Sequence, residues 1–160
     1  MAYTGLRTVE VHRANVKDLR TRGGRRVLWV QGKGHNNKDD FVVLPPKANQ
    51  CLNQWLAERP EDTKSEALFI SYSNRSLGER LTRSAIRRLV KKYFKLANVV
   101  DERKTTHSLR HSAITFAIRG GGDLFQVQEF ARHVDPKTTL KYYHGVDRTE
   151  KPAEDLIDYD

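Results

Sequence analysis

The chain has 160 residues, of which 38% are hydrophobic, and this size fits a single domain that can bury a core. No stretch approaches 18 consecutive apolar residues, so we expect no membrane span and no membrane partner. The first seven residues lack the charged-then-apolar pattern of a secretory signal. The single cysteine, Cys51, excludes an internal disulfide framework and makes a reducing cytoplasm the default location.

Charge gives the first indication of function. The chain has 29 Lys and Arg against 20 Asp and Glu, a net charge of +9. Residues 147–160 contain six acidic and two basic side chains, so residues 1–146 carry a net charge of +13. A basic body with an acidic tail predicts a polyanionic partner, with nucleic acid favoured over an anionic membrane surface. The alternative is a basic surface that serves only solubility.

The first half of the chain predicts a turn or helix, a hairpin and a further helix. Residues 3–11 are typical of a helix end or turn that leads into a second helix. Residues 25–31 and 40–44 are β-rich, and the glycine, asparagine and charged residues between them predict a hairpin with a long tip. Pro45-Pro46 ends the second strand and opens a helix that reaches about Glu58.

Residues 81–97 give the strongest helical pattern, with apolar residues on one face and basic residues on the other. The basic residues predict either a solvated face or contacts to phosphate groups. On the second interpretation, Arg83 and Arg87 are candidate DNA contacts, together with Lys38 in the hairpin.

Three further helices are expected in the last third of the chain. Thr105 or Thr106 can cap a helix over residues 107–119, which three glycines end. Asp123 and Gln126 form a capping pair for a helix that reaches about Ala131, and Asp135-Pro136 opens a helix over residues 137–144. The predicted fold class is therefore mainly α with a small antiparallel β-sheet (α+β).

The candidate chemistry comes from side chains that are scattered along the chain. They are Arg7, Lys33, the pair His107 and Arg110, His133, and Tyr142. Two guanidiniums can bind a phosphate diester, and a phenol is a candidate nucleophile. A phenol with a pKa near 10 costs about 4 kcal/mol to ionise at pH 7. Each well-placed cation contributes roughly 3 kcal/mol of transition-state stabilisation, so two or three can offset this cost. The set suits phosphoryl transfer through a phosphotyrosine.

These motifs, taken together, resemble those of a known family. The matching stretches are Thr4-Gly-Leu-Arg7 with Glu10, Gly32-Lys-Gly34, His107-Ser-Leu-Arg-His111, and the segment from His133 through Thr138-Thr139 to Tyr142. Their order and spacing resemble the catalytic domain of the tyrosine recombinase (phage-type integrase) family from Tyr3 to about His144. The resemblance implies the catalytic-core fold of the DNA breaking-rejoining enzymes.

The resemblance also implies a role for each matching residue. Arg7 and Arg110 look like the two phosphate-binding arginines, and His107 looks like the general acid/base. Lys33 looks like the hairpin lysine that protonates the 5′-hydroxyl leaving group. His133 looks like the histidine that hydrogen-bonds the scissile phosphate, and Tyr142 like the nucleophile. Glu10 and His111 look like supporting residues, and the family uses neither a cofactor nor a metal ion.

By the same resemblance, the partners are double-stranded DNA and other integrase protomers, which form a tetramer on DNA. The expected setting is the cytoplasm of a prokaryotic cell, in the nucleoid when DNA is bound, with DNA integration on a mobile genetic element as one role. We expect a catalytic domain over residues 1–146 and an acidic tail over residues 147–160 that docks on a neighbouring protomer. Family members have additional helices and a DNA-clamping domain before the first arginine motif, so we expect an N-terminally truncated chain.

Several alternatives stay open at the level of single residues. Lys38 could replace Lys33 as the hairpin lysine. We expect His111 to be a buried hydrogen-bonding partner rather than a reacting group. Tyr143 competes with Tyr142 as nucleophile, although neighbouring helical residues face different ways. His107 and His111 have the i, i+4 spacing of a zinc-binding helix, but no clear third ligand accompanies them.

Two alternatives to a catalytic recombinase also remain. One is an inactive DNA-binding or interaction fragment of an integrase. The other is an unrelated basic helical protein, such as an RNA-binding protein.

Overall fold

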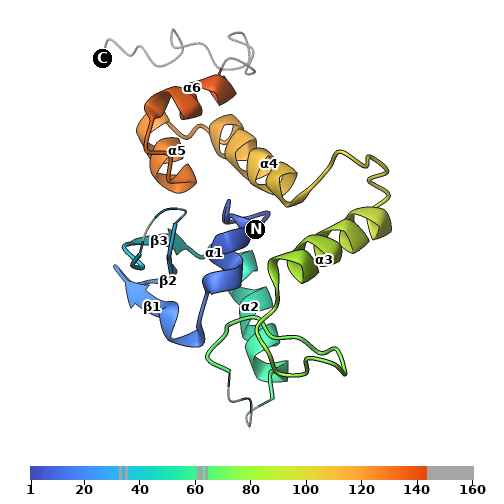
Figure 1. The fold of residues 1–160 in the computed structure, drawn as a ribbon. Coiled ribbons are helices and arrows are strands. Elements are labelled where there is room, and N and C mark those ends of the chain that lie inside the picture. The colour runs from blue at the N-terminus through green and yellow to red at the C-terminus, as the bar shows by residue number, and fades with distance from the viewer. Residues whose placement is uncertain (33, 35, 61–62, 64, 144–160) are drawn as a thin grey trace, which may run out of the picture. The chain divides into compact units, whose positions relative to one another are not determined.

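The computed structural model describes residues 1–160 except 33, 35, 61–62, 64 and 144–160 (Figure 1). The chain divides into two compact units, Met1–Ala113 and Ile114–Asp160, with the boundary inside helix α4. The predicted tail over residues 147–160 lies outside the described residues, so its docking role stays a prediction.

The first unit combines helices with a three-stranded sheet (Figure 1). Its elements are α1 (Thr8–Arg13), a 3₁₀ turn (Val16–Asp18), β1 (Leu19–Arg22), β2 (Arg25–Val30), β3 (Asp40–Val43), α2 (Pro46–Glu58), α3 (Arg83–Leu96) and the first half of α4 (Thr106–Arg119). The sheet order is β1-β2-β3 and both pairings are antiparallel. Leu28 in the central strand pairs with Leu19 and with Val42, which fixes the register of all three strands.

The core of the first unit lies between the sheet, α1, α2 and the segment after α2. Its fully buried members include Leu28, Val30 and Leu68. The segment that holds Leu68 is fixed by an isolated bridge between Asn15 and Ala67, and by the Trp55 indole, which donates to the Leu68 carbonyl at 2.8 Å. This packing holds α1 in place, and the first candidate catalytic arginine stands at the N-terminus of α1.

The predicted hairpin and the helix from Pro46 to Glu58 are confirmed, with two differences from expectation. β1 was not predicted, because three of its four residues are exposed and polar and the strand lacks an apolar alternation. The second difference concerns α3. Only Ile86 on its apolar face is buried, whereas Leu89 and Tyr93 are 41% and 65% exposed. The other elements of this unit leave most of that face uncovered.

The second unit consists of the end of α4 with α5 (Leu124–Ala131) and α6 (Pro136–Tyr143). Its small core contains Ile114, Ile118, Val127 and Ala131. The predicted capping pair is confirmed: the Asp123 carboxylate accepts from the backbone N–H of Gln126 at 2.8 Å, and the Gln126 side chain accepts from the Asp123 N–H at 3.1 Å. No described helix is long and apolar enough to cross a membrane.

Candidate active site

Arg7 stands directly before α1 and is held by a buried carboxylate. Glu10 is 1% exposed, and its side chain accepts from the Arg7 backbone N–H at 2.6 Å and from the Arg7 guanidinium at 2.8 Å. The first contact caps the helix, because the third helical residue satisfies the N–H of the residue before the helix. The second contact orients the guanidinium, whose side chain is 30% exposed. Glu10 therefore orients Arg7, and its supporting role in catalysis stays a prediction.

Arg110 lies on α4 and is 2% exposed. Its guanidinium donates to the backbone carbonyl of Gly5 at 2.5 Å, across 105 residues of sequence. Gly5 has a φ of 56°, a left-handed conformation that glycine adopts without steric cost. The turn before Arg7 thus receives the Arg110 side chain, and the two predicted phosphate-binding arginines are joined through this turn.

The N-terminus of α4 is tied to α1 by a second polar contact. The Thr8 hydroxyl donates to the Thr106 hydroxyl at 2.8 Å, and Thr106 is buried. Thr105 caps the helix, because its hydroxyl accepts from the backbone N–H of His107 at 3.2 Å. His107 is exposed at this end of α4.

The expectation that His111 is buried is wrong. It is exposed, because Arg110 and Ala113 occupy the buried side of α4 and His111 follows Arg110 by about 100° around the helix. Its ring meets that of His107 edge to face, with centroids 4.5 Å apart. Partial desolvation, followed by the charges of His107 and Arg110, lowers the pKa of His111 below its ordinary value. Among the described residues, no three His, Cys, Asp or Glu side chains gather at a metal-binding distance.

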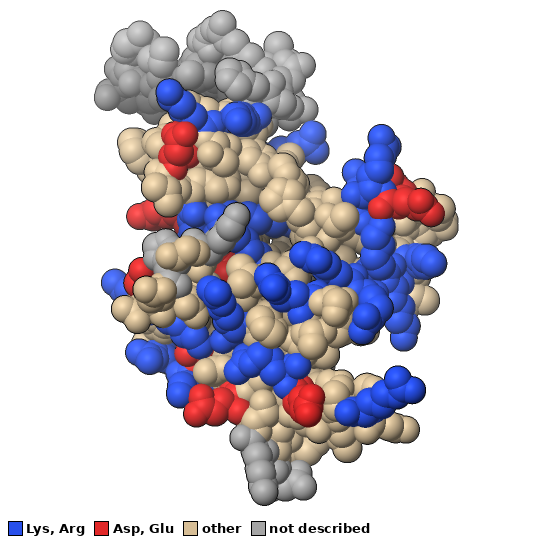
Figure 2. Space-filling view, viewed as in Figure 1, with Lys and Arg blue, Asp and Glu red and all other residues tan. Residues whose placement is uncertain are grey.

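A cleft of about 690 Å³ brings these side chains together within the first unit. Its described lining contains six Lys and Arg residues and one histidine, with no Asp or Glu among them. The charged and imidazole members are Arg7, Arg13, Arg83, Arg87, Lys91, His107 and Arg110. Figure 2 shows Lys and Arg gathered over α3, which supplies three of them. A cationic hollow of this size is suited to an anionic ligand such as a phosphate diester.

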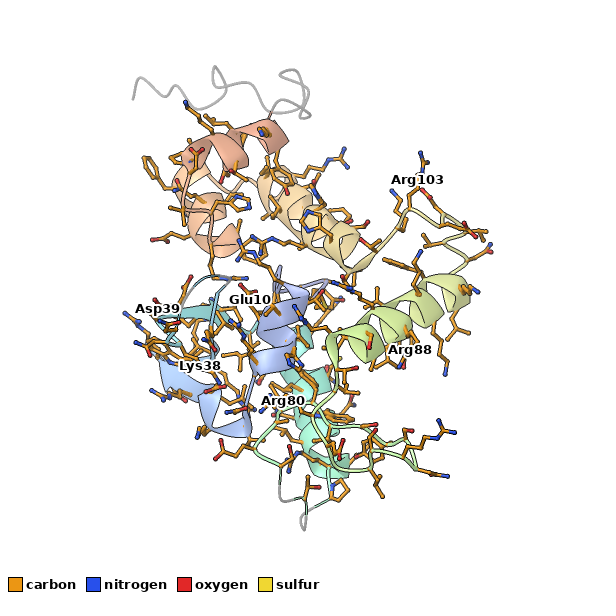
Figure 3. The ribbon with its side chains drawn as sticks, viewed as in Figure 1. Glu10, Lys38, Asp39, Arg80, Arg88 and Arg103 are labelled. Carbon is orange, nitrogen blue, oxygen red and sulfur yellow. The ribbon has the colours of Figure 1, made fainter. Side chains whose placement is uncertain are left out.

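Of the two candidate hairpin lysines, only Lys38 lies among the residues that the structure describes. Lys33 lies outside the described residues, although the next residue, Gly34, lines the cleft. Lys38 is described, and its ammonium binds the buried carboxylate of Asp18 and donates to the Arg13 carbonyl at 3.1 Å. Figure 3 shows Lys38 beside the sheet. Lys38 therefore fixes the hairpin to the turn after α1.

The second unit brings together the two remaining candidates. His133 follows α5, and Tyr142 lies on α6. Their rings are stacked, with centroids 6.1 Å apart and an interplanar angle of 26°. Nδ1 of His133 lies 3.0 Å from the hydroxyl of the fully buried Thr139. Because Thr139 fixes one ring nitrogen and Tyr142 contacts the ring face, the imidazole is held beside the phenol.

Tyr143 is engaged differently from Tyr142. Its hydroxyl donates to the Gly122 carbonyl at 2.7 Å, across the turn between α4 and α5. Burial, followed by the charge of Asp123, raises the pKa of Tyr143 above its ordinary value. Both effects favour the protonated phenol, so Tyr143 acts as a structural donor in this unit.

The sequence is matched by a known family over nearly its whole length. The Phage integrase family profile matches residues 1–149. The chain belongs to this family. Its predicted family resemblance and its predicted fold, mainly α with a small antiparallel sheet, are both confirmed.

Curated relatives in the family are tyrosine recombinases. The chain is 35% identical over 142 residues to tyrosine recombinase XerC of Corynebacterium glutamicum, covering 88% of this chain and 43% of the relative. It is 34% identical over 145 residues to tyrosine recombinase XerD of Staphylococcus epidermidis, covering 88% of this chain and 46% of the relative. The chain thus spans less than half the length of these curated relatives.

Solved recombinase structures have the same fold. The crystal structure of XerA recombinase superposes with a TM-score of 0.78 at 30% identity, covering 99% of this chain and 55% of that one. The XerH site-specific recombinase, in a post-cleavage complex with palindromic difH substrate, gives a TM-score of 0.76 at 27% identity. That match covers 97% of this chain and 43% of XerH.

Sequence reasoning missed several residues that shape the site. Arg13 lines the cleft, and Thr139 holds His133. Lys91, one helical turn after Arg87 and two after Arg83, also lines the cleft and belongs to the basic face that the sequence predicted over residues 81–97. No comparable signal marked Arg13 or Thr139, because their roles depend on contacts made in the folded unit.

Proposed function

We propose that this chain is part of the catalytic domain of a site-specific DNA recombinase, which cleaves and rejoins DNA through a covalent 3′-phosphotyrosine. The observation that carries the proposal is the cationic cleft lined by Arg7, His107 and Arg110. Membership of the Phage integrase family and the recombinase relatives support the same reaction class.

Arg7 and Arg110 bind the phosphate. Each guanidinium is oriented by a protein oxygen, from Glu10 for Arg7 and from Gly5 for Arg110. Guanidiniums that are oriented before the substrate arrives need little reorganisation when charge develops on the phosphoryl oxygens. The scissile phosphate diester binds both of them, and His107 serves as acid/base at the exposed edge of the same cleft.

The nucleophile is Tyr142. Its hydroxyl oxygen attacks phosphorus and gives its proton to His107, the general base, and the bond from phosphorus to the 5′-oxygen breaks. The departing 5′-oxygen takes a proton from Lys33, and His133 donates a hydrogen bond to the phosphate. The new phosphotyrosyl ester keeps the diester bond, so religation by a 5′-hydroxyl runs the same steps in reverse. The reaction requires Tyr142 to reach a phosphate that Arg7 and Arg110 hold.

The proposed partners are duplex DNA and further protomers of the recombinase. XerH, a site-specific recombinase of the same fold, is bound to its difH substrate in the crystal, which supports a DNA site as the partner of this chain. We extend the family pattern to a tetramer on DNA, in the nucleoid of a prokaryotic cell. Because six Lys and Arg residues of the described chain line the cleft, we expect DNA binding to weaken as the salt concentration rises.

The test is formation of a covalent adduct on a nicked duplex, in which loss of a short 5′ fragment traps the phosphotyrosine. We expect a protein–DNA band that survives detergent for the unaltered chain and for Tyr143→Phe, and none for Tyr142→Phe. The two substitutions remove the same atom from neighbouring residues, so each controls for the other. A chain that binds DNA but gives no adduct would instead be an inactive fragment.

A further inference from the structure

One face of the sheet combines arginines with aromatic rings. The strand register pairs Arg22 with Arg25 and Trp29 with Phe41, and these four side chains lie on one face of the sheet. Arg20, two residues before Arg22, lies on the same face. Side chains alternate between the two faces of a sheet, so this face is opposite the one on which Leu28 joins the core. Arg20, Arg22 and Arg25 are all exposed. We call these three arginines and the two rings the arginine–aromatic face.

Two of the three arginines on this face, Arg20 and Arg22, lie over the rings. The guanidinium carbon of Arg20 lies 5.6 Å from the Trp29 ring centroid, and that of Arg22 lies 4.6 Å from the Phe41 centroid. The Trp29 and Phe41 centroids are themselves 5.6 Å apart. Cation–π contacts at these distances hold the guanidinium planes in place. An arginine that is already positioned loses less side-chain entropy when it binds a ligand.

The arginine–aromatic face extends toward the end of the sheet away from the catalytic cleft. β2 begins after the turn at Gly23 and Gly24 and runs toward the hairpin tip, where Gly34 lines the cleft. Six extended residues span about 20 Å, so the backbones of Arg22 and Arg25 lie far from the tip, while the Arg22 guanidinium reaches back along the sheet to Trp29 and Phe41. Figure 1 shows the sheet and α3, the main basic helix, on different sides of α1. The face is thus a second concentration of positive charge in the first unit.

We propose that Arg20, Arg22 and Arg25 form a second site for the phosphate backbone of duplex DNA, distinct from the catalytic cleft. This inference rests on the proposed function, because it takes DNA as the ligand. Residues at i and i+2 of a strand lie about 6.8 Å apart, which is twice the roughly 3.4 Å axial spacing of charges along one DNA strand. The backbone spacing thus matches the phosphate spacing, and the guanidiniums of Arg20 and Arg22, 5.6 and 6.0 Å from the same Trp29 centroid, can bind neighbouring phosphates.

The composition of the face favours DNA over a protein partner. The centre of a protein–protein interface is depleted in charge and rich in exposed apolar side chains. Here the two rings lie under guanidiniums and are only half-exposed, and Val43 is the one large apolar residue of the paired strands that is exposed in the described chain. Exposed, positioned arginines without a broad apolar surface are typical of phosphate contacts.

The test compares the salt dependence of DNA binding in matched variants. The variant Arg20→Gln/Arg22→Gln removes two positive charges from the face. The control Arg75→Gln/Arg119→Gln removes two exposed arginines elsewhere, one from each unit. On a duplex of about 30 base pairs, each lost phosphate contact lowers the slope of log K against log salt by about 0.9. We expect a slope lower by about 1.8 for the face variant, and an unchanged slope for the control.

A charge-preserving variant tests the stacking. Arg20→Lys/Arg22→Lys keeps both charges but loses the planar groups that stack on Trp29 and Phe41. We expect it to retain the salt slope of the unaltered chain and to bind DNA several-fold more weakly. Equal slopes for the glutamine variant and the unaltered chain would overturn the proposal, as would an equal fall in the control. Binding of polyglutamate that is lost in the glutamine variant, without a change in DNA binding, would assign the face to an acidic protein.

The outcome is separable from that of the proposed function. Covalent adduct formation on the nicked duplex at saturating DNA should be unchanged in Arg20→Gln/Arg22→Gln. An adduct with an unchanged salt slope leaves the recombinase assignment in place and refutes the second site. A fall in slope without any adduct supports the second site and refutes the catalytic assignment.

Discussion

The two units hold their candidate catalytic residues in different ways. In the first unit, the arginines are fixed by polar contacts to buried partners, and the bond from Arg110 to Gly5 joins residues 105 positions apart. In the second unit, His133 and Tyr142 are held by neighbours on two eight-residue helices, and the contact from His133 to Thr139 spans six residues. The proposed phosphate-binding part thus depends on the tertiary fold, whereas the proposed nucleophile depends on a small local core.

This difference predicts distinct consequences for substitutions in the two units. Changes in the first unit should affect transition-state stabilisation directly. Changes in the second unit should act through the stability of a small helical assembly, because the buried apolar core of its described part is limited to Ile114, Ile118, Val127 and Ala131.

Arg110→Lys should give the largest effect. The substitution keeps one positive charge but loses the planar group that donates to Gly5 and lines the cleft. We expect the rate of covalent adduct formation to fall by about 100- to 1000-fold, the usual cost of removing one preorganised donor. Arg119→Lys, at an exposed position of the same helix, is the control and should leave the rate unchanged. A loss of less than about tenfold for Arg110→Lys would contradict the role of Arg110.

Glu10→Gln should destabilise the first unit. Glu10 is buried and accepts both from the Arg7 backbone and from its guanidinium, so the neutral amide leaves a charge-assisted bond unmade. We expect the free energy of unfolding in urea to fall by about 2 kcal/mol. Glu66→Gln breaks an exposed ion pair with Lys17 and should cause no measurable change. Equal effects of the two substitutions would show that burial of Glu10 is unimportant.

Gly122→Ala should loosen the second unit alone. A Cβ atom there would lie 3.0 Å from the Ala117 carbonyl oxygen and 3.0 Å from a Val127 methyl group. Overpacking of this kind costs about 1–3 kcal/mol. Hydrogen exchange should therefore speed up in α5 and α6 and stay the same in α1. Faster exchange in α1 as well would contradict an effect confined to the second unit.

Tyr143→Phe should give a smaller effect in the same unit. The substitution removes only the hydroxyl that donates to the Gly122 carbonyl. We expect a loss of about 1 kcal/mol in unfolding free energy, with adduct formation retained. Loss of the adduct with the stability preserved would transfer the nucleophilic role to Tyr143.

His111 should give the smallest effect, which depends on pH. Its pKa is lowered in the folded chain, so the unfolded chain binds more protons between that lowered value and the ordinary value of 6.5. Stability should therefore fall as the pH drops below 6.5, and level off below the folded pKa. His111→Gln should remove this part of the pH dependence of the urea midpoint. A steeper dependence in the variant would contradict the direction of the shift.

Local signals in the sequence predicted the helices well. The Asp123–Gln126 cap and the Pro46 helix start each depend on neighbouring residues, and both are confirmed. β1 was missed because its Leu-Arg-Thr-Arg sequence has no apolar alternation and forms a strand by pairing with β2. A strand that forms because a neighbouring strand pairs with it is hard to predict from its own residues.

The site was predicted less completely than the fold. Spacing placed His107 and Arg110 on one helix, and the order of motifs suggested Arg7, but neither could show that Gly5 receives the Arg110 guanidinium. His111 was expected to be buried and is exposed, because a histidine alone does not reveal which side of a helix meets the core. The role of Lys38 as a partner of buried Asp18 is also a tertiary property.

The most direct test of the proposed reaction is to identify the residue that carries DNA. The trapped adduct is digested with trypsin and nuclease, and the peptide that follows Lys141 is sequenced by mass spectrometry. We predict a nucleotide-derived phosphate on Tyr142 and an unmodified Tyr143. A phosphate on Tyr143 or on any other residue, or the absence of a modified peptide from a chain that binds the nicked duplex, would contradict it.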